Sequence, residues 1–242
     1  MSAQTFERHE RKFLITPEQK ELILNNLKDY LVLDERDNNK GIYNVYSLYF
    51  DDDFDEIIRN SVNKPIYKEK LRMRSYKLNP TDNDKIFLEI KKKYNGVGNK
   101  RRISLSYNEC LDYINGNTRP TFNDYLSNQV LKEIDQVLKR REIYPKMFIS
   151  CKREAFFGKE DKTLRITFDS NITYRNYDVN FSSNEGEILL EDKIVMEVKF
   201  GLAFPYELIR MLSEMGLYRR GYSKYGKVFE KTKKLNNTDK RK

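Results

Sequence analysis

Charged and apolar residues alternate along much of this chain, and this alternation predicts β-strands. Arg72 and Arg74 flank Met73, and Lys70 lies two residues before Arg72. A period of two places charged residues on one face of a strand and apolar residues on the other. Eight segments alternate in this way or are otherwise typical of strands: residues 8–15, 43–50, 67–76, 86–94, 100–106, 147–155, 163–174 and 188–199.

Other segments have hydrophobic residues at helical spacing. Thr16, Pro17 and Glu18 are typical of an N-cap, a first-turn proline and an acidic first turn, so a helix is predicted from there to about residue 30. A stripe of leucine, isoleucine and valine in residues 122–141 indicates a helix that packs on a core. The remaining predicted helices cover residues 54–60, 106–114 and 205–215.

The polar face of the predicted strands is rich in arginine, lysine and glutamate. The doublet Glu-x-Lys occurs in three of them, at residues 10–12, 89–91 and 197–199. An open sheet would expose these charges to water, whereas a closed barrel would enclose them around a hydrated tunnel. Enclosed cations need anions and enclosed carboxylates need cations. A tunnel would therefore suit a polyanion that binds together with a divalent metal.

The size and charge of the chain limit its organisation and its partners. Its 242 residues are enough for one large domain or two small ones, and no linker is evident. With 46 Lys and Arg against 37 Asp and Glu, its formal net charge is +9. A basic balance favours anionic partners such as phosphates, nucleotides or nucleic acid. We predict a single domain over residues 1–230 and a basic, disordered tail over residues 231–242.

Nothing in the sequence indicates export or a membrane span. Cys110 and Cys151 match no metal-binding spacing and are typical of reduced thiols in a cytosolic protein. No stretch approaches the roughly 20 apolar residues of a membrane span. The first residues have no apolar region of a secretion signal. We therefore expect a soluble, cytoplasmic protein.

Short motifs with charged and aromatic residues follow one another in a defined order. They are Arg8–Ile15, Tyr46–Asp51, Leu71–Arg74, Phe87–Lys91, Lys100–Arg102, Arg153–Phe156, Leu164–Asp169, Glu197–Lys199 and Tyr222–Tyr225. As an ordered set they resemble the VTC domain, the polyphosphate polymerase branch of the triphosphate tunnel metalloenzymes in the CYTH-like superfamily. The resemblance extends from about residue 6 to residue 229. Arg8 departs from it, because the family's Glu-x-Glu-x-Lys strand has its first glutamate there.

The resemblance implies a fold and an activity. The expected fold is α+β, an eight-stranded antiparallel β-barrel tunnel with a charged interior and flanking helices. The expected enzyme is a phosphotransferase that moves the γ-phosphate of ATP onto a growing inorganic polyphosphate chain with Mn²⁺ or Mg²⁺. ATP and inorganic polyphosphate or pyrophosphate are then the partners, and nucleic acid is not expected.

The resemblance also implies roles for individual residues. The residues expected to bind phosphate are Lys12, Arg72, Arg74, Lys91, Lys100, Arg102, Arg153, Arg165, Lys199, Ser223 and Lys224. Those expected to act in catalysis are Arg72, Arg74, Lys91, Arg153, Arg165 and Lys224. The expected metal ligands are Glu197, Glu10 and Glu89. Cations would clamp phosphate oxygens, and carboxylates would hold the hard metal ion.

Other functions and simpler roles remain open at this point. A hydrolase of the same fold, acting on inorganic triphosphate or nucleoside triphosphates, would need a carboxylate base for water, so Arg8 favours transfer modestly. A non-catalytic module that binds polyphosphate or nucleic acid is a second alternative. The charged residues of the hairpin could also form an ordinary solvated face. Glu10 and Glu197 could each serve in a structural ion pair.

Overall fold

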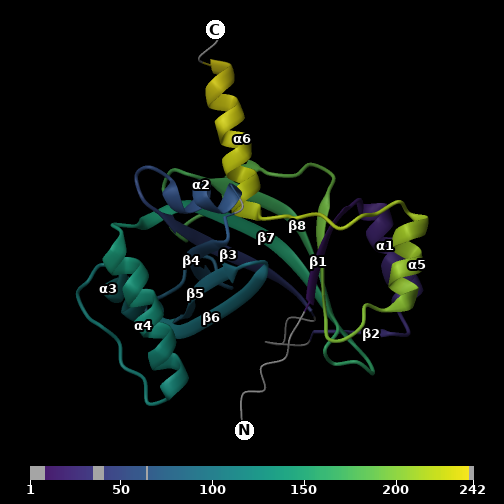
Figure 1. Cartoon of the computed structure of the whole chain (residues 1–242), viewed down its shortest axis with the longest axis horizontal. Helices are drawn as coiled ribbons and strands as arrows, with labels where there is room; N and C mark the ends of the chain where they lie inside the picture. Colours follow the sequence, from purple (N-terminus) through teal and green to yellow (C-terminus); the bar gives the residue numbers. More distant parts are fainter. Residues whose placement is uncertain (1–8, 35–40, 64, 240–242) are drawn as a thin grey trace. The chain divides into compact units, whose positions relative to one another are not determined.

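The computed structural model describes residues 9–34, 41–63 and 65–239, with side chains up to residue 233. Arg8 therefore lies outside the described residues. The strands are β1 (His9–Ile15), β2 (Leu31–Leu33), β3 (Ile42–Asp51), β4 (Tyr67–Ser75), β5 (Lys85–Tyr94), β6 (Val97–Ser106), β7 (Tyr144–Gly158), β8 (Arg165–Arg175), β9 (Glu187–Ile188) and β10 (Ile194–Phe200). The helices are α1 (Pro17–Leu27), α2 (Glu56–Val62), α3 (Tyr107–Ile114), α4 (Tyr125–Arg140), α5 (Tyr206–Glu214) and α6 (Lys224–Asp239) (Figure 1).

The strands form one sheet whose main path has the order β1-β10-β8-β7-β3-β4-β5-β6. The short strands β2 and β9 pair with β7 and β8, off this path. Every pairing with a described register is antiparallel. The α+β class and the antiparallel sheet of eight strands are confirmed. Within the described residues the path is open, with β1 and β6 at its two ends, whereas the sequence predicted a closed barrel.

The chain divides into two compact units that are interleaved along the sequence. The first unit comprises residues 1–44, 151–172 and 190–222, and the second comprises residues 45–150, 173–189 and 223–242. Each unit is therefore assembled from three separate stretches of chain. The single domain predicted over residues 1–230 stays a prediction.

The second unit has its core between β4, β5 and β6 and the helices α3 and α4. Leu131 and Ile134 of α4 belong to one buried cluster with Leu88, Ile90 and Ile103 of the sheet. Figure 1 shows α3 and α4 together beside these strands. Because side chains alternate along a strand, burying the apolar face fixes the charged residues on the opposite face. This packing positions the charged residues described below.

The first unit has a separate core in which α1 and α5 pack on β1, β8 and β10. Ile23 of α1 and Leu208 of α5 belong to the same buried cluster as Phe13, Ile166 and Met196. The predicted start of α1 is confirmed, because Thr16 and Gln19 form a capping box before the first turn. The core thus holds the strands that carry the charged residues of this unit.

The C-terminal segment differs from the disordered tail predicted over residues 231–242, because α6 continues to Asp239. No proline or glycine follows Gly226 to interrupt the helix. The hydroxyl of Thr232 donates to the carbonyl of Val228 at 3.2 Å, and Lys227 forms an ion pair with Glu230 at 2.6 Å. No helix among the described residues is long and apolar enough to cross a membrane.

Candidate functional site

Glu89 is a buried carboxylate at the centre of a group of charges on β4, β5 and β6. The strand register aligns Glu89 with Arg72 and Arg102. Arg72 Nε donates to Glu89 Oε2 at 2.9 Å, and Arg72 Nη2 donates to the same oxygen. Lys100 Nζ lies 2.6 Å from Glu89 Oε1, and Arg74 Nη1 lies 3.6 Å from it. The side chain of Glu89 is only 2% exposed. We call the four ion-paired residues Arg72, Arg74, Glu89 and Lys100 the Glu89 cluster.

The charges in the Glu89 cluster shift the pKa values of its members. Burial raises the pKa of Glu89, but Arg72, Arg74 and Lys100 outweigh burial and hold that pKa well below its usual range. Burial lowers the pKa of Lys100 to about 7, helped by Arg74 and Arg72 and opposed by Glu89. Arg74 Nε is buried with no hydrogen-bond partner among the described residues. Because a buried donor without a partner is costly, an oxyanion placed against Arg74 would be stabilised.

The N-terminus of α6 brings two predicted site residues, Ser223 and Lys224, to the same unit. Lys70 Nζ donates to Ser223 Oγ at 3.1 Å. Burial raises the pKa of Tyr49, but the charges of Arg72 and Lys224 lower it, and Arg72 Nη1 also donates to the Tyr49 hydroxyl at 2.9 Å. The positive charges of Lys224 and Arg72 therefore both act on the Tyr49 hydroxyl.

Two rows of lysines continue the charged face beyond Glu89. Lys70, Lys91 and Lys100 are aligned across β4, β5 and β6, and Lys68 and Lys93 are aligned in the next row of this face. The predicted residue Lys91 thus lies between two other lysines. The fifth predicted cation of these strands, Arg102, packs over the ring of Phe87 at 4.3 Å.

In the first unit, Glu10 and Glu197 share two lysines. The register of β1 and β10 aligns Lys12 with Glu197 and Glu10 with Lys199. Lys12 Nζ lies 3.0 Å from Glu10 Oε1 and 3.2 Å from Glu197 Oε2. Lys199 Nζ lies 3.0 Å from Glu197 Oε1 and 4.0 Å from Glu10 Oε2. We call these four residues the Glu197 cluster.

The charges of the Glu197 cluster favour the charged forms of Glu197 and Lys12. Burial raises the pKa of Glu197, but Lys12, Lys199 and Arg153 outweigh it and hold that pKa well below its usual range. Burial lowers the pKa of Lys12, but Glu197 and Glu10 outweigh it and raise that pKa. Glu197 thus remains anionic at neutral pH, which is the form that binds a metal ion.

The two predicted arginines of the first unit, Arg153 and Arg165, each have a carboxylate partner. Arg153 binds Asp169 through two parallel hydrogen bonds, from Nε to Oδ1 at 2.6 Å and from Nη2 to Oδ2 at 2.8 Å. Arg165 Nη2 donates to Asp34 Oδ2 at 2.8 Å and to the hydroxyl of Tyr43 at 3.1 Å. Arg165 Nε is buried and has no hydrogen-bond partner in the described part of the chain. It could satisfy this donor by binding an anion.

Several residues that contact the charged residues of the two units were not predicted from the sequence. Thr167 is aligned with Glu197, and its hydroxyl is buried without a hydrogen-bond partner among the described residues. The alternation of Arg165 and Thr167 could have indicated that both lie on one face. The roles of Asp34 and Tyr49 depend on contacts between distant segments, so no local signal could have revealed them.

The predicted metal ligands do not form one three-carboxylate group. Within the described residues, no three His, Cys, Asp or Glu side chains come close enough together to hold a metal ion. In phosphate-handling sites, Mg²⁺ is usually held by one or two carboxylates together with substrate phosphates and water, and Mn²⁺ prefers similar oxygen ligands. Glu10 and Glu197 fit this donor set. The carboxylate of Glu89 contacts three cations, and its metal role stays a prediction.

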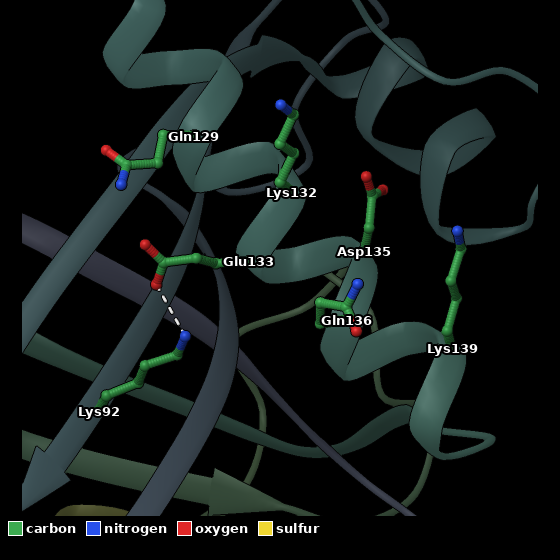
Figure 2. A pocket seen from close by; sticks show the side chains of 7 residues that line it. All are labelled: Lys92, Gln129, Lys132, Glu133, Asp135, Gln136 and Lys139. Atoms are coloured by element: carbon green, nitrogen blue, oxygen red, sulfur yellow. Dashed lines mark hydrogen bonds and ion pairs between the residues drawn. The ribbon is translucent and has the colours of Figure 1, made fainter.

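A separate hollow of about 410 Å³ lies along α4. Figure 2 shows Lys92 of β5 reaching Glu133 of α4, while Lys132 and Lys139 extend from the helix. No predicted site residue lines this hollow. Lys92 and Lys91 are adjacent on β5, so they point to opposite faces of the sheet. We therefore place the candidate site on the charged strand faces and not in this hollow.

Comparisons with solved structures show where this fold occurs elsewhere. A candidate adenylate cyclase from Bacillus halodurans aligns with a TM-score of 0.53 and 12% sequence identity, over 88% of this chain and 92% of that chain. A protein from Pyrococcus horikoshii aligns with a TM-score of 0.47 and 13% identity, over 92% of this chain and 99% of that chain. The first likeness shows a shared fold. No curated protein matches the sequence significantly.

The family comparison covers nearly the whole chain. The profile described as "VTC domain" matches residues 7–233, nearly the whole chain. The match includes both charged groups and the N-terminal part of α6. The chain therefore belongs to the VTC-domain family.

Proposed function

We propose that the protein is a metal-dependent polyphosphate polymerase that transfers the γ-phosphate of ATP to inorganic polyphosphate. The observation that carries the proposal is the Glu89 cluster on a VTC-domain chain, with the unpartnered donor Arg74 Nε beside Lys100 and the lysine rows. These donors suit phosphate oxygens. Arginine can bind such oxygens through two parallel hydrogen bonds, which also fixes the orientation of the phosphate.

Phosphoryl transfer depends mainly on positioning and charge neutralisation. In the proposed reaction, a terminal oxygen of the polyphosphate chain attacks the γ-phosphorus of ATP. The new P–O bond lengthens the chain by one phosphate, while the bond to the β–γ bridging oxygen breaks and ADP leaves with the electron pair. Arg72, Arg74 and Lys91 would hold the oxygens of the transferring group, and Lys224 would add positive charge beside Arg72.

The arrangement of the carboxylates favours transfer over hydrolysis. The attacking phosphate oxygen is already anionic and needs no base, whereas an attacking water would need one. Glu89 is a poor base because its three cationic partners hold its pKa far below neutral. Glu10 and Glu197 would hold Mn²⁺ or Mg²⁺, which would neutralise charge on the phosphates.

A turnover assay with ATP and Mn²⁺ tests the proposal. Products are separated into long phosphate chains and free phosphate, and wild type is compared with Arg74→Ala and Glu197→Gln. We expect chain products from wild type and a loss of at least about a hundredfold in both variants, the usual scale for removing a charge-stabilising group. Arg101→Ala is the matched control, since Arg101 pairs with Glu133 on the opposite strand face.

The products also separate the polymerase from the alternatives. Formation of only ADP and free phosphate would exclude the polymerase and indicate a hydrolase of the same fold. Binding of polyphosphate without any turnover would indicate a binding module.

A further inference from the structure

We infer that Lys12 fills the metal position of the ligand-free protein, and that metal entry releases its ammonium group to bind phosphate. This inference rests on the proposed function, because it adds a means of regulation to the proposed metal site. It concerns only residues of the first unit.

The geometry around Lys12 resembles the surroundings of a bound cation. Three oxygen atoms, one from β1 itself and two from distant parts of the chain, lie within 3.4 Å of Lys12 Nζ. They are Glu10 Oε1 at 3.0 Å, Glu197 Oε2 at 3.2 Å and the carbonyl oxygen of Tyr222 at 3.4 Å. Carboxylate and backbone carbonyl oxygens are also the ligands of hard divalent cations. The ammonium therefore uses the oxygen atoms that we propose for the metal.

Lys12 and a metal ion cannot occupy this place together. Two positive charges a few ångströms apart repel each other strongly in a partly buried site. The carboxylates would bind a divalent ion more strongly than the single charge of an ammonium. Metal entry therefore requires the side chain of Lys12 to move away from Glu10 and Glu197.

The structure allows this movement of the side chain without movement of the strand. The backbone of Lys12 is held by the pairing of β1 with β10 and by a hydrogen bond from the Arg220 amide to the Lys12 carbonyl at 2.8 Å. The side chain is flexible and 20% exposed. Lys199 stays beside Glu197 on the other carboxylate oxygen, Oε1. The released ammonium needs a new anionic partner, and a bound phosphate would provide one.

A direct consequence is reciprocal coupling between the metal and phosphate. If the metal frees Lys12 for phosphate, it raises the affinity for phosphate. Phosphate that holds Lys12 away then raises the affinity for the metal by the same factor. The site would thus bind metal alone, or phosphate alone, more weakly than it binds the two together.

Mn²⁺ binding in the absence of nucleotide tests the inference. Free Mn²⁺ is measured by electron paramagnetic resonance during titration of wild type, Lys12→Gln and Lys199→Gln. Both substitutions remove one positive charge next to Glu197, but only the first removes the ammonium that lies within 3.2 Å of both carboxylates, since Lys199 lies 4.0 Å from Glu10. We expect Lys12→Gln to raise Mn²⁺ affinity at least about tenfold and several times more than Lys199→Gln does.

Two further variants define the site. Glu197→Gln should abolish the tight binding in both the wild-type and the Lys12→Gln background. Lys12→Arg keeps the charge and should leave Mn²⁺ affinity close to that of wild type. Equal gains for Lys12→Gln and Lys199→Gln would overturn the inference in favour of general electrostatics, and weaker Mn²⁺ binding in Lys12→Gln would overturn it outright.

The coupling is measured separately with a non-hydrolysable β,γ-methylene ATP analogue. We expect Mn²⁺ to raise the affinity for the analogue less in Lys12→Gln than in Lys199→Gln; an equal or larger gain in Lys12→Gln would contradict the inference. These assays involve no turnover. A protein that meets these expectations but makes no polyphosphate would exclude the polymerase and leave the role of Lys12 intact.

Discussion

At the scale of single residues, the buried carboxylate of Glu89 holds three cations of β4 and β6 close together. Glu89→Gln removes the negative charge while keeping the size of the side chain, so Arg72, Arg74 and Lys100 would repel one another. We expect a loss of about 3–5 kcal/mol in the free energy of unfolding at pH 7, as for other broken buried ion pairs. Urea unfolding measures this loss.

Glu133→Gln is the matched control on the other strand face. Glu133 pairs with Lys92 and Arg101 but is 23% exposed, so its loss should cost about 1 kcal/mol or less. The effect of Glu89 should also depend on pH. Its folded-state pKa lies below the unfolded value of 4.5, so its contribution is complete above that pH and is lost as the pH falls below it. Equal losses for the two variants, or a difference unchanged in acid, would contradict the ion-pairing role.

Lys100 is expected to make phosphate binding sensitive to pH near neutrality. Its pKa is lowered to about 7, so in the free protein it loses its proton as the pH rises through 7. A bound phosphate stabilises the charged form and raises this pKa. Binding should therefore take up a proton, and affinity should fall as the pH rises from 7 to 9.

Calorimetry in buffers of different ionisation enthalpy measures this proton uptake with inorganic triphosphate. In Lys100→Arg the side chain stays positively charged throughout this pH range. The variant should therefore lose the part of the proton uptake that is due to Lys100. The variant also controls for titration of the triphosphate itself. Identical uptake by wild type and Lys100→Arg would show that Lys100 does not change its charge on binding.

At the scale of elements, the alternation along β4, β5 and β6 was sufficient to predict the charged face. Leu88 and Ile90 had to face the core, which placed Glu89 and Lys91 opposite them. The extension of α6 was not predictable in the same way. Its polar residues 231–239 give no apolar stripe, and part of its support is a contact with a distant segment, in which Lys231 Nζ donates to the carbonyl of Ile188 at 2.8 Å.

The lysine rows on these strands predict a dependence on chain length. Lys93 lies four residues from Glu89 on β5, or about 13 Å along the strand. A triphosphate bound by the cations of the Glu89 cluster would not reach Lys93. A longer phosphate chain along this face would contact Lys93. We expect Lys93→Gln to weaken binding of long polyphosphate several-fold and leave triphosphate binding unchanged.

Competition binding with phosphate chains of defined length measures this difference. Lys92→Gln is the neighbouring control, because Lys92 faces the other side of the strand and pairs with Glu133. Lys93→Gln should also reduce the salt dependence of long-chain binding, since one fewer cation contacts the polyanion. A similar loss for both chain lengths would place the long chain elsewhere.

At the scale of the whole molecule, the order of short motifs predicted the family and the antiparallel sheet. The sequence could not reveal that the chain forms two interleaved units, because this depends on which distant strands pair. Glu10 and Glu197 illustrate the limit. Each lies in a recognisable Glu-x-Lys doublet, but only the pairing of β1 with β10 brings the two carboxylates to the same lysine.

The pairing of β1 with β10 also has a consequence for the synthesis of the protein. Lys12 contacts the carbonyl of Tyr222, which lies 210 residues later in the chain. A nascent chain on the ribosome therefore carries β1 without this partner until β10 has been made. Because contacts between such distant residues form slowly, β1 should be among the last strands to fold. The proposed metal site would form only after β10 and Tyr222 have been synthesised, and a product truncated before β10 would lack it.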